Sequence, residues 1–196
     1  MVRILAIDVG IKNMSYCLLE TGGKPVESRP RIVQWKNISV LSPSMNCKTT
    51  SLDCITESML LKLGDHFDSD CIVDTVVIEN QPATKNQTMK SVSMVIYTYF
   101  HMLRLQYGQV EQVRFSPATN KLKCKKRFKA PFSSLPQKTY AQRKSLAVRL
   151  TKGYLEEWFD TNTNTLKDLE WFDAQKKKDD LSDAFLLAVY HAEKLH

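Results

Sequence analysis

The amino-acid sequence predicts an α/β fold in which helices flank a mixed sheet of five strands. Short apolar or alternating segments, each bounded by turn residues, predict strands at about 2–8, 14–20, 31–40, 72–79 and 110–115. Longer segments with apolar residues at helical spacing predict helices at about 52–67, 87–107, 139–159 and 180–195. The first three strands have no helix between them, and helices alternate with the later strands, which is typical of a mixed sheet.

The N-terminal strands have clear boundaries in the sequence. The first is a short apolar segment that ends in the turn sequence Asp8-Val9-Gly10. The second ends at Thr21-Gly22-Gly23 and the third follows Pro30, so the three are expected to form an antiparallel meander. Ser51 is suited to cap the helix that follows them.

The middle of the chain contains its most apolar strand and its longest helix. The strand at 72–79 ends in Glu79. The helix that begins near Gln87 has apolar residues on more than one face between Met89 and Leu105, which predicts burial on two sides. In a domain of this size, one of these sides is expected to be a subunit interface.

The C-terminal part begins with a strand at 110–115 and continues into a basic segment at 120–137. This segment contains Pro131 and Pro136 and is predicted to be a long loop. The helix at 139–159 is basic in its first half, a polar linker is expected at 161–165, and the last helix begins near Asp180.

The composition is that of one folded domain, spanning residues 1–196, with a basic insertion at about 121–138. Its apolar fraction of 43% allows a core without disulfides or metal. The five cysteines form no Cys-x-x-Cys pair, so neither a disulfide framework nor a zinc site is expected. No apolar segment is long enough to cross a membrane, no signal or transit peptide is recognisable, and no membrane partner is expected.

Positive charge is concentrated in one part of the chain. The net charge is +7, and no Asp or Glu occurs between Gln112 and Leu155. Such one-sided charge favours a polyphosphate partner, although a solvated basic face is the ordinary alternative for an isolated basic segment.

Acidic residues stand where their burial would be costly without a partner. Asp8 and Glu79 each end a strand with a buried sequence pattern, and α/β ligand sites commonly lie at the carboxyl ends of strands. Asp180 and Asp183 share one face at the start of the last helix, and Asp179 and Asp183 do so equally well. Each acid alone could be a strand end or a helix cap. Together they predict a site for Mg²⁺ or Mn²⁺, whose preferred ligands are carboxylate oxygens.

Three sequence motifs carry a resemblance to a known family. They are Ile7-Asp8-Val9-Gly10-Ile11-Lys12-Asn13, Ile78-Glu79-Asn80-Gln81-Pro82 and Asp179-Asp180-Leu181-Ser182-Asp183-Ala184-Phe185. In order and spacing they resemble the RuvC-type Holliday junction resolvases, in particular those of fungal mitochondria and of large DNA viruses such as poxviruses and iridoviruses.

The resemblance implies an RNase H-like fold and a homodimer that makes paired, symmetric cuts in four-way DNA junctions. It implies that Asp8, Glu79, Asp180 and Asp183 bind two Mg²⁺ or Mn²⁺ ions, and it favours Asp180 over Asp179. It further implies a basic residue facing the scissile phosphate, for which Lys144 is the candidate. The residues expected near DNA are Lys12, Asn13, Gln81, Lys125, Lys126, Arg127 and Arg143.

Other functions are compatible with parts of this pattern. Another nuclease of the RNase H superfamily, acting on RNA–DNA hybrids or flaps, would share the acids. A non-catalytic nucleic-acid-binding module would gain nothing from acids that face phosphates. A phosphotransferase of the actin and sugar-kinase type needs a second domain, and the chain is too short for one. The expected location is intracellular, at a viral replication site in the cytoplasm, with the mitochondrion or nucleus as alternatives.

Overall fold

The structure is a computed structural model that describes residues 1–22, 30–67, 72–82, 84, 86–127, 139–159 and 163–195. Its strands are β1 (Val2–Asp8), β2 (Met14–Thr21), β3 (Arg31–Ile38), β4 (Val73–Asn80) and β5 (Val110–Pro117). Its helices are α1 (Leu52–His66), α2 (Gln87–Tyr107), the 3₁₀ helix η1 (Ala118–Arg127), α3 (Tyr140–Phe159), α4 (Thr163–Ala174) and α5 (Lys178–Ala192).

The five strands form one mixed sheet in the order β3-β2-β1-β4-β5. β1, β2 and β3 pair antiparallel, as the meander predicted, whereas β4 pairs parallel to both β1 and β5. The three parallel strands therefore present their carboxyl ends at one edge of the sheet, and the predicted fold class is confirmed.

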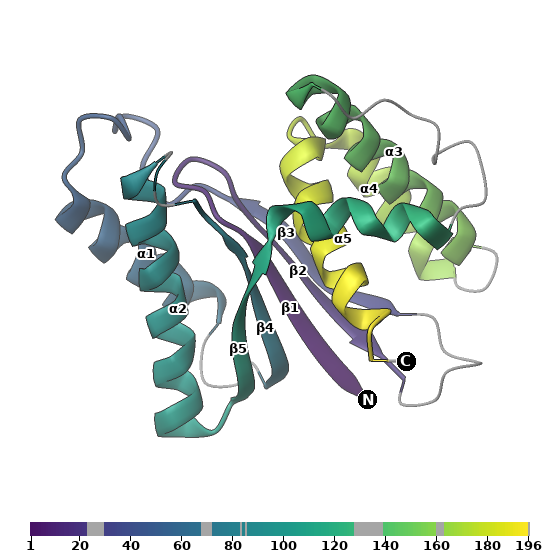
Figure 1. Cartoon of the computed structure of the whole chain (residues 1–196), viewed down its shortest axis with the longest axis horizontal. Coiled ribbons are helices and arrows are strands. Elements are labelled where there is room, and N and C mark those ends of the chain that lie inside the picture. Colours follow the sequence, from purple (N-terminus) through teal and green to yellow (C-terminus); the bar gives the residue numbers. More distant parts are fainter. Residues whose placement is uncertain are drawn as a thin grey trace.

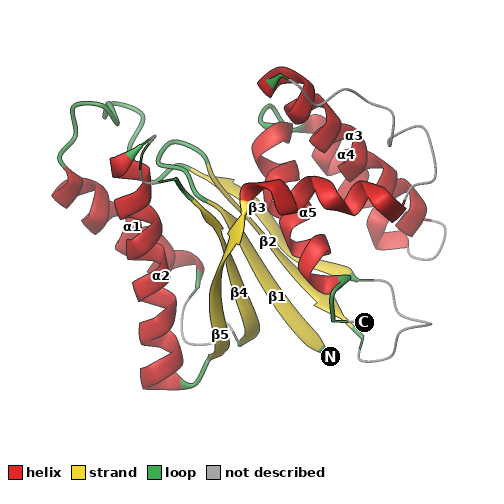
Figure 2. Ribbon diagram, in the orientation of Figure 1, coloured by secondary structure: helices red, strands yellow, loops and turns green. Residues whose placement is uncertain are grey.

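Helices cover both faces of the sheet, which gives three layers (Figures 1 and 2). α1 and α2 lie on one face, and α3, α4, α5 and η1 lie on the other. Each face has its own core, since alternate residues of every strand point to opposite sides. α5 crosses β1 and β2 directly and is buried along most of its length.

Local sequence signals set the ends of the first two helices. The side chain of Ser51 accepts a hydrogen bond from the backbone N–H of Cys54, and that of Asn86 accepts one from Met89. Gly108 ends α2 in the left-handed conformation, with a φ of 66°, which glycine adopts without a steric penalty.

Two expectations for the C-terminal half were wrong. Residues 118–127 form the helix η1 rather than the start of a loop, and the rest of the predicted loop lies outside the described residues. η1 is held by tertiary contacts, because Tyr154 donates a hydrogen bond to the carbonyl of Cys124 and the Cys124 thiol donates one to Leu186.

The polar linker expected at 161–165 overlaps the start of α4. This helix is stabilised by packing that its polar N-terminal sequence does not reveal. Phe172 is fully buried and stacks on Trp35, with ring centroids 5.0 Å apart.

α2 buries one face and leaves apolar residues exposed on another. Val92, Ile96, Phe100 and Leu103 pack into the core. On the other side Met94, Met102 and Leu105 are exposed by 41%, 41% and 77%. In the described part of the chain, no helix is long and apolar enough to cross a membrane.

Candidate active site

A row of polar side chains crosses the sheet near the carboxyl ends of β1, β4 and β5. It consists of Asn37, Ser15, Asp8, Glu79 and Ser116, one from each strand in sheet order. The side chains of all five lie on the α5 face of the sheet. In β1, β2, β3 and β4, each is two residues from one that packs in the core on that face, and Ser116 of β5 contacts His191 of α5. This set is called the polar row below.

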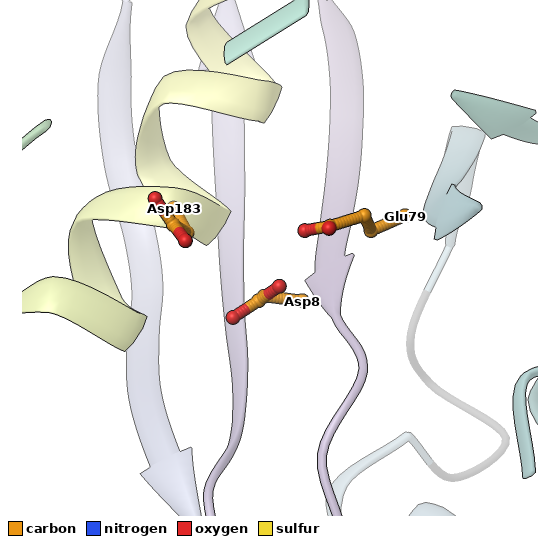
Figure 3. Close-up of side chains that lie close together, drawn as sticks. All are labelled: Asp8, Glu79 and Asp183. Carbon is orange, nitrogen blue, oxygen red and sulfur yellow. The ribbon is translucent and has the colours of Figure 1, made fainter. Parts of the chain in front are cut away.

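Three acids from three elements meet at the centre of this row. Asp8 ends β1, Glu79 lies near the end of β4, and Asp183 extends from the first part of α5 toward both (Figure 3). One carboxylate oxygen from each lies within 4.8 Å of the others. Such a cluster has the spacing that a single divalent cation requires, and its oxygen donors fit Mg²⁺ or Mn²⁺.

The turn after β1 brings the backbone of Asn13 close to Gly10. A Cβ atom at Gly10 would lie 2.2 Å from the backbone oxygen of Asn13, so only glycine fits this tight return from Asp8 to β2. The predicted motif from Ile7 to Asn13 is thus a structural turn as well as the source of one acid.

Lys121 of η1 inserts its ammonium group among the acids. Its Nζ lies 3.0 Å from a Glu79 oxygen and 2.5 Å from an Asp183 oxygen. The side chain is only 13% exposed. Burial alone would lower the pKa of Lys121, but the charges of Asp8, Asp183 and Glu79 raise it above its ordinary value, so the side chain stays charged.

The three acids differ in protonation because their surroundings differ. Burial and the hydrogen bond with Glu79 raise the pKa of Asp8 well above its usual value. Burial also raises the pKa of Asp183, to about 6, although Lys121 opposes this. Burial acts in the same direction on Glu79, but the hydrogen bond from Asp8 and the charge of Lys121 lower its pKa overall. Of these two acids, Asp8 is therefore the one that binds a proton more readily.

Asp180 lies outside this group of three and is paired with another lysine. The Nζ of Lys144 contacts Asp179 and lies 3.5 Å from an Asp180 oxygen. The pKa of Asp180 is raised by burial and by the negative charge of Asp179. Burial acts in the same direction on Asp179, but the hydrogen bond from Lys144 and its positive charge help to lower the pKa of Asp179 overall. Lys144, the predicted basic residue, thus lies at the start of α5, beside the acid that the family motif selects.

The residues predicted to lie near DNA occur in three parts of the chain. Lys12, Asn13 and Gln81 follow the strands that supply Asp8 and Glu79, and Lys12 is exposed. Arg143 precedes Lys144 on α3 and is exposed. The backbone of Lys125, Lys126 and Arg127 forms the end of η1, and their side chains lie outside what the structure describes.

The chain is similar in sequence to a family of mitochondrial resolvases and to a viral protein. Residues 4–99 match the family model described as mitochondrial resolvase Ydc2 / RNA splicing MRS1. An uncharacterized protein of Acanthamoeba polyphaga mimivirus is 34% identical over an alignment of 141 residues, and the match covers 67% of this chain and 32% of that protein. The chain therefore spans about a third of the length of this curated relative.

Solved structures match nearly the whole chain. The fowlpox virus resolvase in complex with substrate Holliday junction DNA matches with a TM-score of 0.58 and 15% identity, over 99% of both chains. Thermus thermophilus RuvC matches with a TM-score of 0.57 and 12% identity, over 97% of this chain and 93% of that one.

Residues 4–99 of the chain are thus similar to the mitochondrial resolvase family, and its fold is similar to that of the RuvC-type Holliday junction resolvases. The resemblance seen in the sequence motifs is thereby confirmed, and the fold is the RNase H-like fold that it implied. In this fold the polar row lies where the parallel strands end, which is the usual place for a ligand site in a mixed α/β sheet.

The sequence interpretation missed the position of Lys121. It counted this residue only among the basic residues of the predicted loop, because spacing along the chain does not show which lysine turns inward. One signal was present: Lys121 comes shortly after β5, whose residue Ser116 pairs with Glu79.

Proposed function

We propose that this chain is a metal-dependent endonuclease that resolves four-way DNA junctions. The observation that carries the proposal is the convergence of Asp8, Glu79 and Asp183, from two core strands and a buried helix, at one edge of an RNase H-like sheet. Three acids packed this closely repel one another and gain from a divalent cation.

Each role that the family resemblance implies is assigned to a residue of this chain. Asp8, Glu79, Asp180 and Asp183 would hold two Mg²⁺ or Mn²⁺ ions, and Asp8, Glu79 and Asp183 lie close enough together to share one of them. A pair of such ions activates a water molecule and stabilises the leaving oxygen in phosphodiester cleavage. Lys144 would orient the scissile phosphate, and its contact with Asp179 and Asp180 keeps it at the start of α5.

Lys121 belongs with this machinery because its ammonium group already lies between two of the acids. A charged lysine in that position offsets the repulsion among the carboxylates. It also places a positive charge beside any phosphate that approaches them.

Branched DNA as the substrate is supported by the distribution of charge. The basic helix η1 and the basic start of α3 both lie on the α5 side of the sheet, where the acids are (Figure 1). Paired cuts in a four-way junction need two active sites, and a second copy of the chain bound through the exposed face of α2 would supply the other. The proposed location is a viral replication site in the cytoplasm.

A second candidate function is recognition of structured RNA without cleavage. It is favoured by one observation, namely that the matching family description also includes an RNA-splicing protein. The cluster of acids speaks for the nuclease, since negative charge facing phosphates weakens binding unless a cation intervenes.

The test is a comparison of substrates with the purified chain. A labelled four-way junction, a DNA duplex, a flap and an RNA–DNA hybrid are incubated with and without Mg²⁺. We expect symmetric paired cuts in the junction alone, and only with Mg²⁺. Cleavage of the hybrid or flap instead would assign another activity to the same acids.

Asp8→Asn provides the matched control for this experiment. It keeps the size of the side chain and removes the charge that a cation needs. We expect the variant to bind junctions and to cut none of them. Binding of RNA without any cleavage by the wild-type chain would favour the second candidate.

A further inference from the structure

Two members of the polar row have no role in the acidic cluster. Ser15 is fully buried, and its hydroxyl has no hydrogen-bond partner among the described residues. The side-chain nitrogen of Asn37, next to it on β3, is likewise buried without a partner in the described part of the chain. Both groups are hydrogen-bond donors.

A buried donor without a partner is costly. Leaving a buried polar group unsatisfied costs on the order of 1–3 kcal/mol, and alanine would avoid that cost at position 15. The unpaired hydroxyl of Ser15 therefore calls for an explanation, and a partner in another state of the protein would supply one.

The sheet register shows where this hydroxyl can act. Ser15 lies directly opposite Asp8 in the antiparallel pairing of β1 and β2, and both side chains are on the α5 face. Side chains opposite each other in this way have Cβ atoms about 4.5–5.5 Å apart. The Ser15 hydroxyl is therefore within reach of the Asp8 carboxylate, which in this structure shares a hydrogen bond with Glu79 on its other side.

We propose that Ser15 is the positioning residue for Asp8 when a divalent cation is bound. With a cation among the three acids, the hydrogen bond between Asp8 and Glu79 gives way to contacts with the ion. The Ser15 hydroxyl then donates to the Asp8 oxygen that faces away from the ion, and the Asn37 amide donates to Ser15. This inference rests on the metal site of the proposed function, and it identifies the residues that orient one of its ligands.

The donors and acceptors in the polar row support hydrogen bonds that run from Asn37 to Ser15 and from Ser15 to Asp8. An ionised carboxylate only accepts hydrogen bonds, a hydroxyl both donates and accepts, and an amide nitrogen only donates. Asn37, Ser15 and Asp8 stand in that order across β3, β2 and β1. Groups that orient metal-binding carboxylates in this way typically contribute about 10–100-fold to metal affinity.

The test compares Ser15→Ala with a matched control. Thr151 of α3 is another fully buried residue whose hydroxyl has no partner among the described residues, and α3 carries none of the three acids. Thr151→Val removes that hydroxyl with little change in volume. For both variants and the wild type, Mn²⁺ binding without DNA is followed by the electron paramagnetic resonance signal of free Mn²⁺, and thermal unfolding is measured with and without the ion.

We expect Ser15→Ala to bind Mn²⁺ at least about tenfold more weakly while its metal-free Tm is unchanged or higher. Thr151→Val should bind Mn²⁺ as the wild type does. Wild-type affinity in Ser15→Ala would overturn the proposal. A lower metal-free Tm in Ser15→Ala would also overturn it, because the hydroxyl would then already have a partner.

Failure of this inference is distinguishable from failure of the proposed function. If the wild type binds Mn²⁺ and Ser15→Ala binds it more weakly, Ser15 has its role even when junctions are not cut. If junctions are cut and Ser15→Ala binds Mn²⁺ normally, the nuclease stands and the role of Ser15 does not.

Discussion

Asp8 shows how an acid whose burial is unfavourable indicates a functional site. It lies on a strand whose other residues are buried, and burial and the neighbouring Glu79 raise its pKa. An acid in such a position lowers the stability of the fold once it is ionised, because the folded state favours its protonated form. A bound cation would remove that penalty. Ionised Asp8 would therefore destabilise the metal-free fold and strengthen metal binding.

Asp183 makes metal binding dependent on pH. Its pKa is raised to about 6, mainly by burial, and a proton on its carboxyl group competes with a cation. Below about pH 6 the proton is held, so metal affinity should fall as the pH falls from about 7 to about 5. Each displaced proton contributes up to about a tenfold change in affinity per pH unit. Mn²⁺ titrations at several pH values measure this effect.

Asp183→Asn is the control for that pH dependence. It should bind Mn²⁺ more weakly at neutral pH and with a flatter dependence on pH, since one competing proton is gone. An equally steep dependence in the variant would assign the titration to other groups, such as Asp8.

At the scale of elements, η1 carries a lysine into the acidic cluster. Asn120 anchors its first turn by donating a hydrogen bond to Ser116, and the Ser116 hydroxyl also lies 3.0 Å from a ring nitrogen of His191. The contacts of Cys124 with α3 and α5 anchor the next turn. Lys121 lies between these two anchors, so the position of its ammonium group follows from the packing of the whole helix.

Lys121→Met should destabilise the metal-free protein. Removing the ammonium group leaves the buried acids without a compensating positive charge. Removing one partner of a buried ion pair costs about 3 kcal/mol of stability. The destabilisation should be largest near neutral pH and smaller near pH 5, where Asp183 holds a proton. Urea unfolding at the two pH values, with and without Mg²⁺, measures it.

Lys123→Met is the matched control for this prediction. Lys123 belongs to the same helix, but its Nζ contacts the side-chain oxygen of Asn120, 2.7 Å away, rather than a carboxylate. We expect little change in stability for this variant. Equal destabilisation in both variants would mean that Lys121 acts through the helix and not through its charge.

At the scale of the whole molecule, the exposed apolar face of α2 is the surface proposed for a second copy. Met94, Met102 and Leu105 recur at a spacing that places them on one side of the helix, away from the core. Changing Met94 and Leu105 together to glutamate should give a monomer by analytical ultracentrifugation. The same variant should nick junctions singly rather than cut them in pairs.

Leu61→Glu tests whether any exposed leucine has this effect. Leu61 is 71% exposed on α1, on the same side of the sheet. It should leave the association of the chain unchanged. Dissociation by this variant, with none by the α2 variant, would move the interface to α1.

Junction binding should depend strongly on salt, and part of this dependence should come from the end of η1. Neutralising Lys125, Lys126 and Arg127 should reduce the slope of log K against log salt by about 0.9 for each phosphate that these side chains neutralise in the wild type. Neutralising Lys48, Lys62 and Arg104, which lie on the α1 and α2 side, should leave the slope unchanged. Equal slopes for the first variant and the wild type would show that this segment does not contact phosphates.

The sequence by itself determined the five strands, the antiparallel meander and most of the helices, because periodicity and caps act over short distances. It also indicated that Asp8 and Glu79 would meet, since parallel strands bring their carboxyl ends to one edge of the sheet.

Only the tertiary structure decided which other groups join those two acids. It placed Asp183 with them and paired both Asp179 and Asp180 with Lys144. It turned Lys121 inward and set Ser15 opposite Asp8. These arrangements depend on contacts between segments far apart in the chain, and local sequence patterns do not encode such contacts.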